Sequence, residues 1–251
     1  MGSEMKRRQT ASRQGRLRGK VAVVTGGSRG IGLAVAQALA AEGCAVVLAG
    51  RDIRALRAAA AGIARHGGEA MAQACDVRDQ GSVAELFAET TRRFRRLDIL
   101  VNNAGIAHPP CKIEQLPLRA WRTVLDTNLT GMFLCAKAAI PLLRRGGVMV
   151  NNLSIAAKRV FPGTFAYDTS KHGALGLTRA LREELRSRGI RVMALLPGPT
   201  ATDIWEQFWP GAPRSRMISP AEVAAVVVES VVLPAGTSVE ELVIGPTRGA
   251  L

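Results

Sequence analysis

KVAVVTGGSRGIGLAVAQALAA, residues 20–41, places a glycine-rich loop between a short apolar run and a stretch rich in alanine and leucine. The run 20–25 predicts a strand, and the stretch 31–41, closed by Gly43, predicts a helix. Glycines at such a junction allow a tight turn and let the backbone approach a pyrophosphate, which the free N–H groups at the helix start can bind. A glycine pattern alone is a weak signal, but its position after a first strand favours a dinucleotide-binding unit.

The rest of the chain repeats this alternation of strand and helix. We expect further strands at 45–49, 69–75, 98–101, 148–153, 191–196 and 242–244, and helices at 53–65, 81–93, 118–143, 165–188 and 220–233. Alternating elements with short connections are typical of βαβ units and a parallel sheet. The sequence therefore predicts an α/β fold over residues 20–251: a single Rossmann-type, doubly wound catalytic domain with a mostly parallel seven-stranded sheet and helices on both faces.

The chain of 251 residues is strongly basic, with a formal net charge of +14. Seven Lys or Arg residues and one Glu lie among the first 20, so we expect residues 1–19 to form a flexible basic tail, because like charges repel. A targeting segment or an arm that binds nucleic acid or a membrane surface is an alternative. Nucleic-acid binding, which we do not expect, would depend on salt and be lost with the tail. The basic body favours anionic ligands, such as phosphorylated cofactors or acidic partners.

The sequence gives no sign of a membrane span, a disulfide framework or a metal site. No uncharged apolar run approaches the roughly 18 residues that cross a bilayer, and no signal-peptide core follows the basic start. We therefore expect a soluble, cytoplasmic protein. The cysteines and histidines are widely scattered and form no Cys-x-x-Cys pair: Cys44, Cys75, Cys111, Cys135, His66, His108 and His172.

The end of the second predicted strand bears on the choice between NAD and NADP. An acidic residue there would accept hydrogen bonds from a ribose 2′-hydroxyl, whereas an arginine accommodates a 2′-phosphate. Gly50 takes the place of the acid, Arg51 supplies a cation, and Arg29 in the glycine loop can add a second contact. We therefore expect NADP(H). Asp52 would lie near the ribose if the strand ended one residue later, although we favour a helix N-cap as its role.

Tyr167 is the only tyrosine of the chain, and Lys171 follows it four residues later in a predicted helix. Residues at this spacing share one face of a helix. A neighbouring ammonium favours the phenolate and lowers the phenol pKa from its ordinary value of about 10. The pair therefore predicts a proton donor or acceptor near neutral pH, with a surface tyrosine as the alternative.

Together these features resemble the short-chain dehydrogenase/reductase family over residues 20–251. Its motifs occur here in the family's order: the loop at 25–32, Asp76-Val77, Asn102-Asn103-Ala104-Gly105, Asn128-Leu129-Thr130-Gly131, Ser154, Tyr167-x-x-x-Lys171 and Pro197-Gly198. Each motif is short, but the order is specific, with Ser154 thirteen residues before Tyr167. The resemblance implies an NADP(H)-dependent oxidoreductase that interconverts a carbonyl and an alcohol.

The family's catalytic roles carry over to four residues. The resemblance implies that Tyr167 exchanges the proton on the substrate oxygen and that Ser154 hydrogen-bonds this oxygen. Lys171 would lower the tyrosine pKa and bind the nicotinamide ribose, and Asn128 would hold a water in a proton relay. Asp168, where the family has a small residue, would partly oppose the effect of Lys171.

The resemblance also implies a set of cofactor-binding residues and no metal ligand. Asp76 and Val77 would bind the adenine end, although Asp76 is also a candidate helix cap, and Thr200 competes with Thr202 for the nicotinamide carboxamide. The whole set is Gly26, Ser28, Arg29, Gly30, Ile31, Gly32, Arg51, Asp76, Val77, Asn103, Ala104, Gly105, Tyr167, Lys171, Pro197, Gly198, Thr200 and Thr202.

The loop 197–219 follows the sixth predicted strand and carries Trp205, Phe208 and Trp209. These aromatic residues look exposed, and either a structural cap or a substrate lid explains them. We expect the loop to close over a largely apolar substrate pocket. His108 can reach such a pocket, but we favour a solvent-facing position for it.

Two further alternatives remain open for function. A 3-oxoacyl-[acyl-carrier-protein] reductase suits the basic body, although the stretch 243–248 departs from the Asp-Gly-Gly ending common in those enzymes. A non-catalytic NADPH-binding sensor would have no need of the complete catalytic set. From the resemblance alone we also expect a homodimer or homotetramer assembled through the helices 118–143 and 165–188.

Overall fold

The computed structural model describes residues 15–249, and within them the strands form one seven-stranded sheet. The strands are β1 (Val21–Thr25), β2 (Ala45–Gly50), β3 (Ala70–Ala74), β4 (Leu97–Asn102), β5 (Leu143–Asn152), β6 (Arg191–Pro197) and β7 (Glu241–Ile244). Their order is β3-β2-β1-β4-β5-β6-β7, and every neighbouring pair is parallel. The predicted α/β class and seven-stranded sheet are confirmed.

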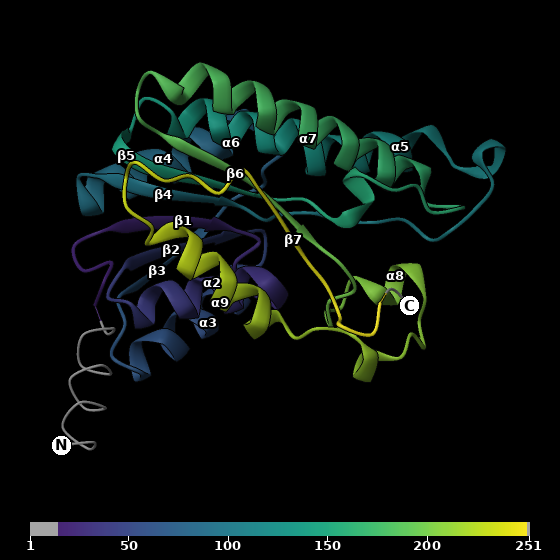
Figure 1. The fold of residues 1–251 in the computed structure, drawn as a ribbon, viewed down its shortest axis with the longest axis horizontal. Helices are drawn as coiled ribbons and strands as arrows, with labels where there is room; N and C mark the ends of the chain where they lie inside the picture. Colours follow the sequence, from purple (N-terminus) through teal and green to yellow (C-terminus); the bar gives the residue numbers. More distant parts are fainter. Residues whose placement is uncertain (1–14, 250–251) are drawn as a thin grey trace.

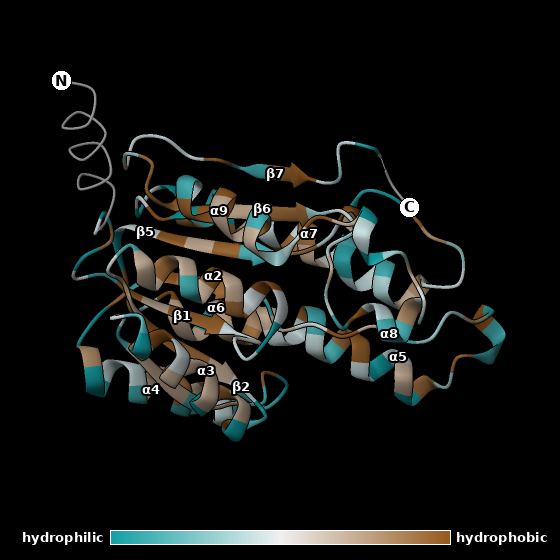
Figure 2. Cartoon of the chain, turned by 90° about the horizontal axis from the view of Figure 1, so that it is seen from below, coloured by the Kyte–Doolittle hydropathy of each residue, from teal (hydrophilic) through white to brown (hydrophobic). Residues whose placement is uncertain are grey.

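Helices cover both faces of the sheet (Figure 1). One face carries α2 (Gly30–Ala41), α3 (Ile53–Arg65) and α9 (Pro220–Val231). The opposite face carries α4 (Gln80–Phe94), α5 (Leu118–Leu125), α6 (Gly131–Ala139) and α7 (Phe165–Arg186). The central strands are therefore buried on both sides, which explains their continuous apolar sequence. In Figure 2, which looks onto one face of the sheet, the strands are largely brown, the colour of hydrophobic residues.

The two faces of the sheet build two separate parts of the core. In β1, Ala22 and Val24 pack on the side of α2 and α9, while Val23 packs on the side of α4 and α6. Alternate side chains of a strand point to opposite faces, so one short strand contributes to both parts. Packing on both faces holds the strands in register. The loops at the carboxyl edge of the sheet are built on these fixed strand ends.

The strand order reverses beside β1, because the chain runs outward from β1 to β3 and then returns to place β4 on the other side of β1. In open α/β sheets, ligands bind outside the carboxyl ends of the strands at such a switch point. The loops that follow β1 and β4 meet there: Asn103 Nδ2 donates to the carbonyls of Thr25 and Gly26, at 2.9 and 3.2 Å.

The long helix predicted over residues 118–143 is wrong in two respects. It is interrupted by a π-helical segment, Asp126–Thr130, between α5 and α6. It also ends at Ala139, and β5 begins at Leu143, five residues before the predicted start. Pro141 explains the early end, because it lacks the N–H that would continue the helical hydrogen bonds and its ring clashes with the carbonyl one turn before it.

The start of the domain also differs from the prediction. Residues 15–19 pack against the domain, with Leu17 buried and the Arg16 guanidinium bound to Glu42 and Glu229 at 2.6 and 2.9 Å. A tail that extends to residue 19 is therefore wrong for its last five residues, and residues 1–14 lie outside the described residues. Between residues 15 and 249, no helix is long and apolar enough to cross a membrane.

Candidate active site

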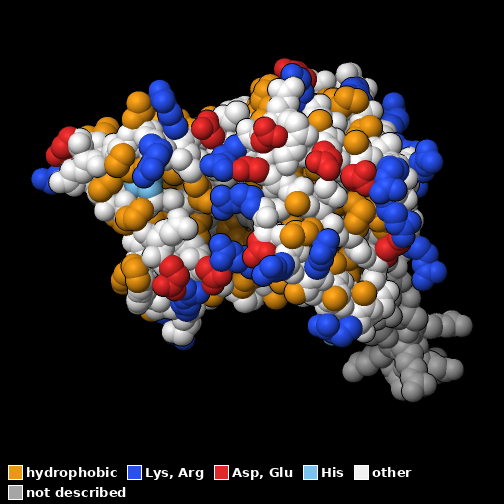
Figure 3. All heavy atoms as spheres, turned by 180° about the vertical axis from the view of Figure 1, so that it is seen from behind, with side chains coloured by type: hydrophobic (Ala, Val, Ile, Leu, Met, Phe, Trp, Pro, Cys, Tyr) orange, Lys and Arg blue, Asp and Glu red, His pale blue; other side chains and the backbone are white. Residues whose placement is uncertain are grey.

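A cleft of about 770 Å³ opens at the carboxyl edge of the sheet. The loops after all of β1 to β6 contribute to its lining, so residues far apart in the sequence meet there. Figure 3 shows the hollow on this face, with Lys and Arg side chains around it. Eighteen of the twenty expected catalytic and cofactor-binding residues line this cleft, and the two that do not are Asn128 and Gly32.

The glycine loop has the shape that close approach of a pyrophosphate requires. Gly26 and Gly30 adopt φ angles of 63° and 56°, a region that glycine tolerates best. A Cβ on Gly26 would lie 2.9 Å from Asn103 Nδ2. The N-terminus of α2 begins at Gly30, directly after this turn. The loop therefore fits a dinucleotide phosphate bound at a helix start.

Gly32 does not line the cleft, and its assignment as a cofactor contact stays a prediction. A Cβ there would lie 2.3 Å from the Gly26 carbonyl oxygen and 2.4 Å from Asn103 Nδ2. Real side chains do not approach so closely, so Gly32 is needed to seat α2 against the loop. Its role is packing beneath the site.

Three guanidinium groups line the end of the cleft that the loops after β1, β2 and β3 form. Arg29 pairs with Asp203 at 3.4 Å, and Arg78 makes a two-pronged ion pair with Asp76, at 2.6 Å at its shortest. Arg51 is exposed and forms no ion pair with any residue from 15 to 249. An unpaired arginine at the end of β2 is ready to bind an anion.

The two acidic residues of this end have defined roles. Asp52 accepts hydrogen bonds from Arg54 N and Ala55 N, at 3.0 and 3.1 Å, so it is the N-cap of α3. The hydrogen bond from Arg78, the largest effect, lowers the pKa of the Asp76 carboxyl. Sequence reasoning missed Arg78, although the Asp-x-Arg spacing at 76–78 was a visible signal.

Tyr167 and Lys171 lie on one face of α7 as predicted. Lys171 Nζ lies 5.4 Å from the centre of the Tyr167 ring and donates to the carbonyl of Asn152 at 3.3 Å. Ser154 begins a 3-10 turn, Ile155–Ala157, and its hydroxyl lies near enough to the Tyr167 phenol to lower the phenol pKa. The three groups therefore converge at the cleft, close to the carboxyl end of β5.

Burial, more than the neighbouring charge, sets the protonation of this pair. Burial raises the pKa of Tyr167 to about 12, the hydrogen bond with Ser154 opposes the rise, and the Asp168 carboxylate adds to it. Burial also lowers the pKa of Lys171 to about 8. The predicted lowering of the phenol pKa is therefore wrong, because desolvation disfavours both charged forms. The phenol keeps its proton at neutral pH.

Asn128 lies behind the cleft, in the π-helical segment. Its Nδ2 donates to the Ile106 carbonyl and to Ser170 Oγ, and its Oδ1 accepts from Ile106 N. Ser170 Oγ in turn donates to the Tyr167 carbonyl at 2.7 Å. The Asn128 side chain thus ties the loop after β4 to α7, and its role in a water relay stays a prediction.

Pro197, Gly198, Thr200 and Thr202 all line the cleft at the end of β6. Thr200 Oγ1 donates to the Gly198 carbonyl at 3.0 Å, and the Thr202 side chain lies against Gly30. Both threonines therefore face the same region, so the choice between them for a carboxamide contact stays open.

The loop 197–219 folds over the cleft and contains α8 (Trp205–Phe208). Trp205 Nε1 donates to the Thr200 carbonyl at 2.9 Å, and Gln207 Oε1 accepts from Ala107 N at 3.1 Å. The Phe208 ring meets the Tyr167 ring edge-on, with centres 4.9 Å apart. Only Trp209 of the three aromatic residues is exposed, so the expectation of an exposed cluster is wrong for the other two.

His108 is buried, contrary to the solvent-facing position expected for it. Its side chain is 3% exposed, and its ring packs against Phe165 with centres 5.5 Å apart. It does not line the cleft. Loop histidines look alike in sequence, and only the fold of the β4–α5 connection decides which way this one faces.

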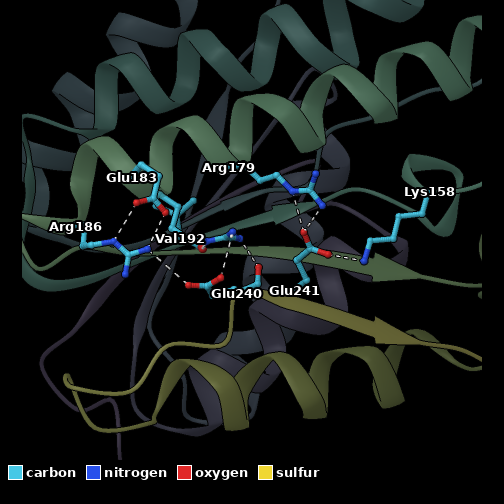
Figure 4. Close-up of polar contacts among 8 residues, drawn as sticks. Lys158, Arg179, Glu183, Arg186, Val192, Glu240 and Glu241 are labelled. Carbon is cyan, nitrogen blue, oxygen red and sulfur yellow. Dashed lines mark hydrogen bonds and ion pairs between the residues drawn. The ribbon is translucent and has the colours of Figure 1, made fainter.

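A network of ion pairs holds the catalytic segments against the edge of the sheet (Figure 4). Glu241 of β7 binds Lys158 at 2.5 Å and Arg179 at 2.8 Å. Lys158 follows the turn that begins at Ser154, and Arg179 belongs to the helix that carries Tyr167. Glu241 thereby fixes these two segments relative to each other.

Among residues 15–249, no group of three or more His, Cys, Asp or Glu side chains could hold a metal ion.

Comparison with known proteins agrees with this geometry. The chain is 40% identical over 222 residues to a 3-oxoacyl-[acyl-carrier-protein] reductase of Synechocystis sp., covering 84% of this chain and 88% of that protein. It is 38% identical over 212 residues to a 3beta-hydroxysteroid dehydrogenase of Mediterraneibacter gnavus, covering 84% and 75%. An alcohol dehydrogenase from the archaeon Thermococcus sibiricus, solved with 5-hydroxy-NADP, superposes with a TM-score of 0.86 at 31% identity, covering 92% of this chain and 98% of that one.

The sequence profile described as short chain dehydrogenase matches residues 20–212, which include the glycine loop, Ser154, Tyr167 and Lys171. The fold, the relatives and this match agree, and the chain belongs to the short-chain dehydrogenase family of oxidoreductases.

Proposed function

We propose that this protein is an NADP(H)-dependent oxidoreductase that interconverts a carbonyl compound and an alcohol. The observation that carries the proposal is the convergence of Ser154, Tyr167 and Lys171 at a cleft that also contains the glycine loop. A pure NADPH-binding sensor would need the loop without the other three groups.

The chain's own part in the reaction is to orient the substrate and manage one proton. A bound nicotinamide would supply the hydride to the carbonyl carbon, or accept it in the reverse direction. The Ser154 hydroxyl holds the substrate oxygen and stabilises the charge that develops there. Tyr167, whose phenol is protonated at neutral pH, donates its proton to that oxygen during reduction. The Lys171 ammonium, beside the ring, stabilises the phenolate that is left.

Replacing Tyr167 with Phe tests the proton transfer. The change removes one oxygen, so we expect kcat to fall by about 10²- to 10⁴-fold. NADPH binding, measured by the change in its fluorescence, should stay within twofold of the wild-type protein. A Y167F variant that keeps its turnover would remove Tyr167 from the role.

The preference for NADP(H) rests on Arg51. Gly50 leaves no acid at the end of β2, and the Arg51 guanidinium is unpaired among residues 15–249 and faces the cleft. An R51Q variant should bind NADPH at least about tenfold more weakly, because it loses a charge-assisted contact, and should bind NADH unchanged. Fluorescence titration with each cofactor measures these affinities. Tighter binding of NADH than of NADPH by the wild-type protein would overturn the preference for NADP(H).

A 3-oxoacyl-[acyl-carrier-protein] reductase is the second candidate, favoured by the 40% identity with the Synechocystis relative of that name. Oxidation of NADPH with acetoacetyl thioesters, compared with simple ketones, separates the two activities. A higher kcat/KM for a thioester bound to an acidic carrier protein than for the same acyl group on a small thiol would support this candidate.

A further inference from the structure

The loop 197–219, which we call the lid, places a wall of apolar side chains directly against the catalytic tyrosine. Ala107, Ala156 and Tyr167 form a small buried cluster, and Ile204 and Phe208 of the lid pack against it. The Phe208 ring meets the Tyr167 ring edge-on at 4.9 Å. A substrate whose oxygen reaches Ser154 and Tyr167 must therefore place its carbon skeleton among these side chains.

The charged side chains of the cleft lie elsewhere. Those that line it at the loops after β1 to β3 are Arg29, Arg51, Asp52, Asp76 and Arg78, and Asp203 of the lid pairs with Arg29. Lys171 lies beside the Tyr167 ring and contacts the Asn152 carbonyl. No other charged residue lines the cleft in the described part of the chain. The remaining lining beyond Tyr167 is mainly apolar, as at Ile106, Pro110, Ile155, Phe161, Ile204 and Trp209.

Thr164 and Gln207, the polar side chains of this part of the lining, are uncharged. Thr164 Oγ1 donates to the Phe161 carbonyl at 3.0 Å, and Gln207 Oε1 accepts from Ala107 N at 3.1 Å, which leaves the Gln207 Nε2 group as a neutral donor. A substrate carboxylate placed here would therefore lose its water without gaining a cationic partner, and a polyol would find one amide donor for its several hydroxyl groups. Ser154 and Tyr167 hold the reacting oxygen.

We infer that the substrate is an uncharged ketone or secondary alcohol with an apolar carbon skeleton, and that Phe208 determines this specificity. The inference rests on the proposed carbonyl–alcohol activity. Sugars, polyols and oxo acids are disfavoured, because their additional polar groups would meet the apolar wall. An apolar skeleton is favoured, because the side chains of Phe208 and Ile204 offer contact area without hydrogen-bonding groups.

A matched set of substrates tests the class by turnover. With NADPH, we expect kcat/KM for 4-methylcyclohexanone to exceed that for 4-oxocyclohexanecarboxylate by at least about 100-fold, because only the charged group differs at that position. Erythrulose, a polyhydroxy ketone, should be a similarly poor substrate. Equal or better turnover of the carboxylate or of erythrulose would overturn the inference while leaving the proposed activity intact.

Binding provides a second readout that needs no chemistry. In the presence of NADP⁺, 4-methylcyclohexanol should raise the melting temperature at a lower concentration than 4-hydroxycyclohexanecarboxylate does. Y167F should show the same order of binding, because the wall is unchanged. If no ketone is turned over but this order of binding holds, the proposed activity fails and the assigned ligand class stands. The reverse order of binding would overturn the class directly.

Substitutions at Phe208 separate an apolar contact from a general effect on the lid. F208L keeps an apolar side chain and should retain kcat/KM for 4-methylcyclohexanone within about threefold. F208S should lose at least about tenfold, mainly through KM, because apolar contact area is lost. Met217, which belongs to the same lid and does not line the cleft, supplies the control: M217S should leave kcat/KM within about twofold. Equal losses in F208L, F208S and M217S would show that the lid acts only as a cover and would remove Phe208 from the specificity role.

Discussion

Lys171 is the residue at which stability and function conflict most clearly. Its side chain is buried beneath the cleft with one hydrogen bond, to the Asn152 carbonyl, and burial lowers its pKa from 10.5 to about 8. Below about pH 8 the amine is charged in both the folded and the unfolded chain, so the full cost of burying the charge opposes folding. Between about 8 and 10.5 the folded protein loses this proton first, and the cost diminishes.

Replacing Lys171 with Met should therefore stabilise the protein while it abolishes turnover. At pH 7 and without cofactor, we expect the free energy of unfolding to rise by up to about 3 kcal/mol, because a lowered pKa of this size measures the burial cost. The gain should shrink as the pH is raised toward 9.5. Denaturant unfolding at several pH values measures both effects.

Lys137 provides the matched control for this substitution. It lies exposed on α6, so K137M should change the free energy of unfolding by no more than about 0.5 kcal/mol and show no comparable pH dependence. A K171M variant that is less stable than the wild-type protein at pH 7 would show that the ammonium is well solvated or paired, and that burial does not dominate its pKa.

At the scale of elements, the junction between β1 and α2 depends on Gly32. Because a Cβ there would lie 2.3 Å from the Gly26 carbonyl oxygen, Gly32→Ala must push α2 away from the glycine loop. We expect G32A to lower the free energy of unfolding by about 1–3 kcal/mol and to weaken NADPH binding at least about tenfold. Thermal unfolding and fluorescence titration measure these two effects.

Gly62 in α3 gives the opposite expectation for the same change. A Cβ at Gly62 would meet only the Arg65 guanidinium, at 3.7 Å, so G62A should stabilise the helix by about 0.5–1 kcal/mol. If G32A proved as harmless as G62A, the tight contact between α2 and the loop would be absent in solution.

The lid and the glycine loop are linked through charge. Arg29 of the loop pairs with Asp203, which also lies 3.9 Å from Arg214 of the lid, and both members of the Arg29–Asp203 pair are exposed. If Arg29 binds the cofactor 2′-phosphate as we expect, the phosphate competes with Asp203 for this side chain. We therefore expect D203N to bind NADPH about two- to fivefold more tightly, the range for an exposed ion pair, and to bind NADH unchanged.

Glu206→Gln separates this competition from a general change in charge. Glu206 belongs to the same lid but pairs with Arg214 rather than Arg29. Equal tightening in E206Q and D203N would attribute the effect to the overall field of the lid. Weaker NADPH binding by D203N would contradict the competition itself.

The order of strands and helices was predictable because each central strand is a continuous apolar run and each helix has its own periodicity. The interruption of the helix at 126–130 was not, since the bonds from Asn128 to Ile106 and Ser170 depend on tertiary contacts. The end of that helix was visible in Pro141. The motifs located Ser154 and Tyr167, whereas the pKa of Tyr167 depends on how deeply the folded chain buries it.

The lid shows the same limit of sequence reasoning. Its aromatic residues were visible, but their directions follow from two bonds that join distant segments, Gln207 to Ala107 and Trp205 to Thr200. Arg16 and Leu17 are a further case. Their basic surroundings predict a solvated tail, whereas in the folded chain Arg16 pairs with Glu42 and Glu229 from distant segments. Contacts between segments far apart in sequence therefore decide what local patterns leave open.

At the scale of the whole molecule, α5, α6 and α7 form a layer on one side of the sheet (Figure 1). Large apolar side chains of this layer are exposed to solvent in the single chain: Leu118 is 59% exposed and Phe133 is 45% exposed. The same layer contains the two helical regions through which we expect a homodimer or homotetramer to assemble. Apolar side chains exposed on a helical surface are typical of an interface between copies.

We therefore expect the protein to sediment as a dimer or larger species at micromolar concentration, and F133E to shift it toward the monomer. A carboxylate buried in the interface would oppose association even with Lys137 beside it, because both charges would lose water, whereas in the separate chain they would stay in water at little cost. Sedimentation velocity measures the species, and A58E, which adds the same charge on the exposed side of α3, is the control and should leave assembly unchanged. A wild-type protein that sediments as a monomer would contradict the expected assembly, and an F133E variant that associates as the wild type does would place the interface on another face.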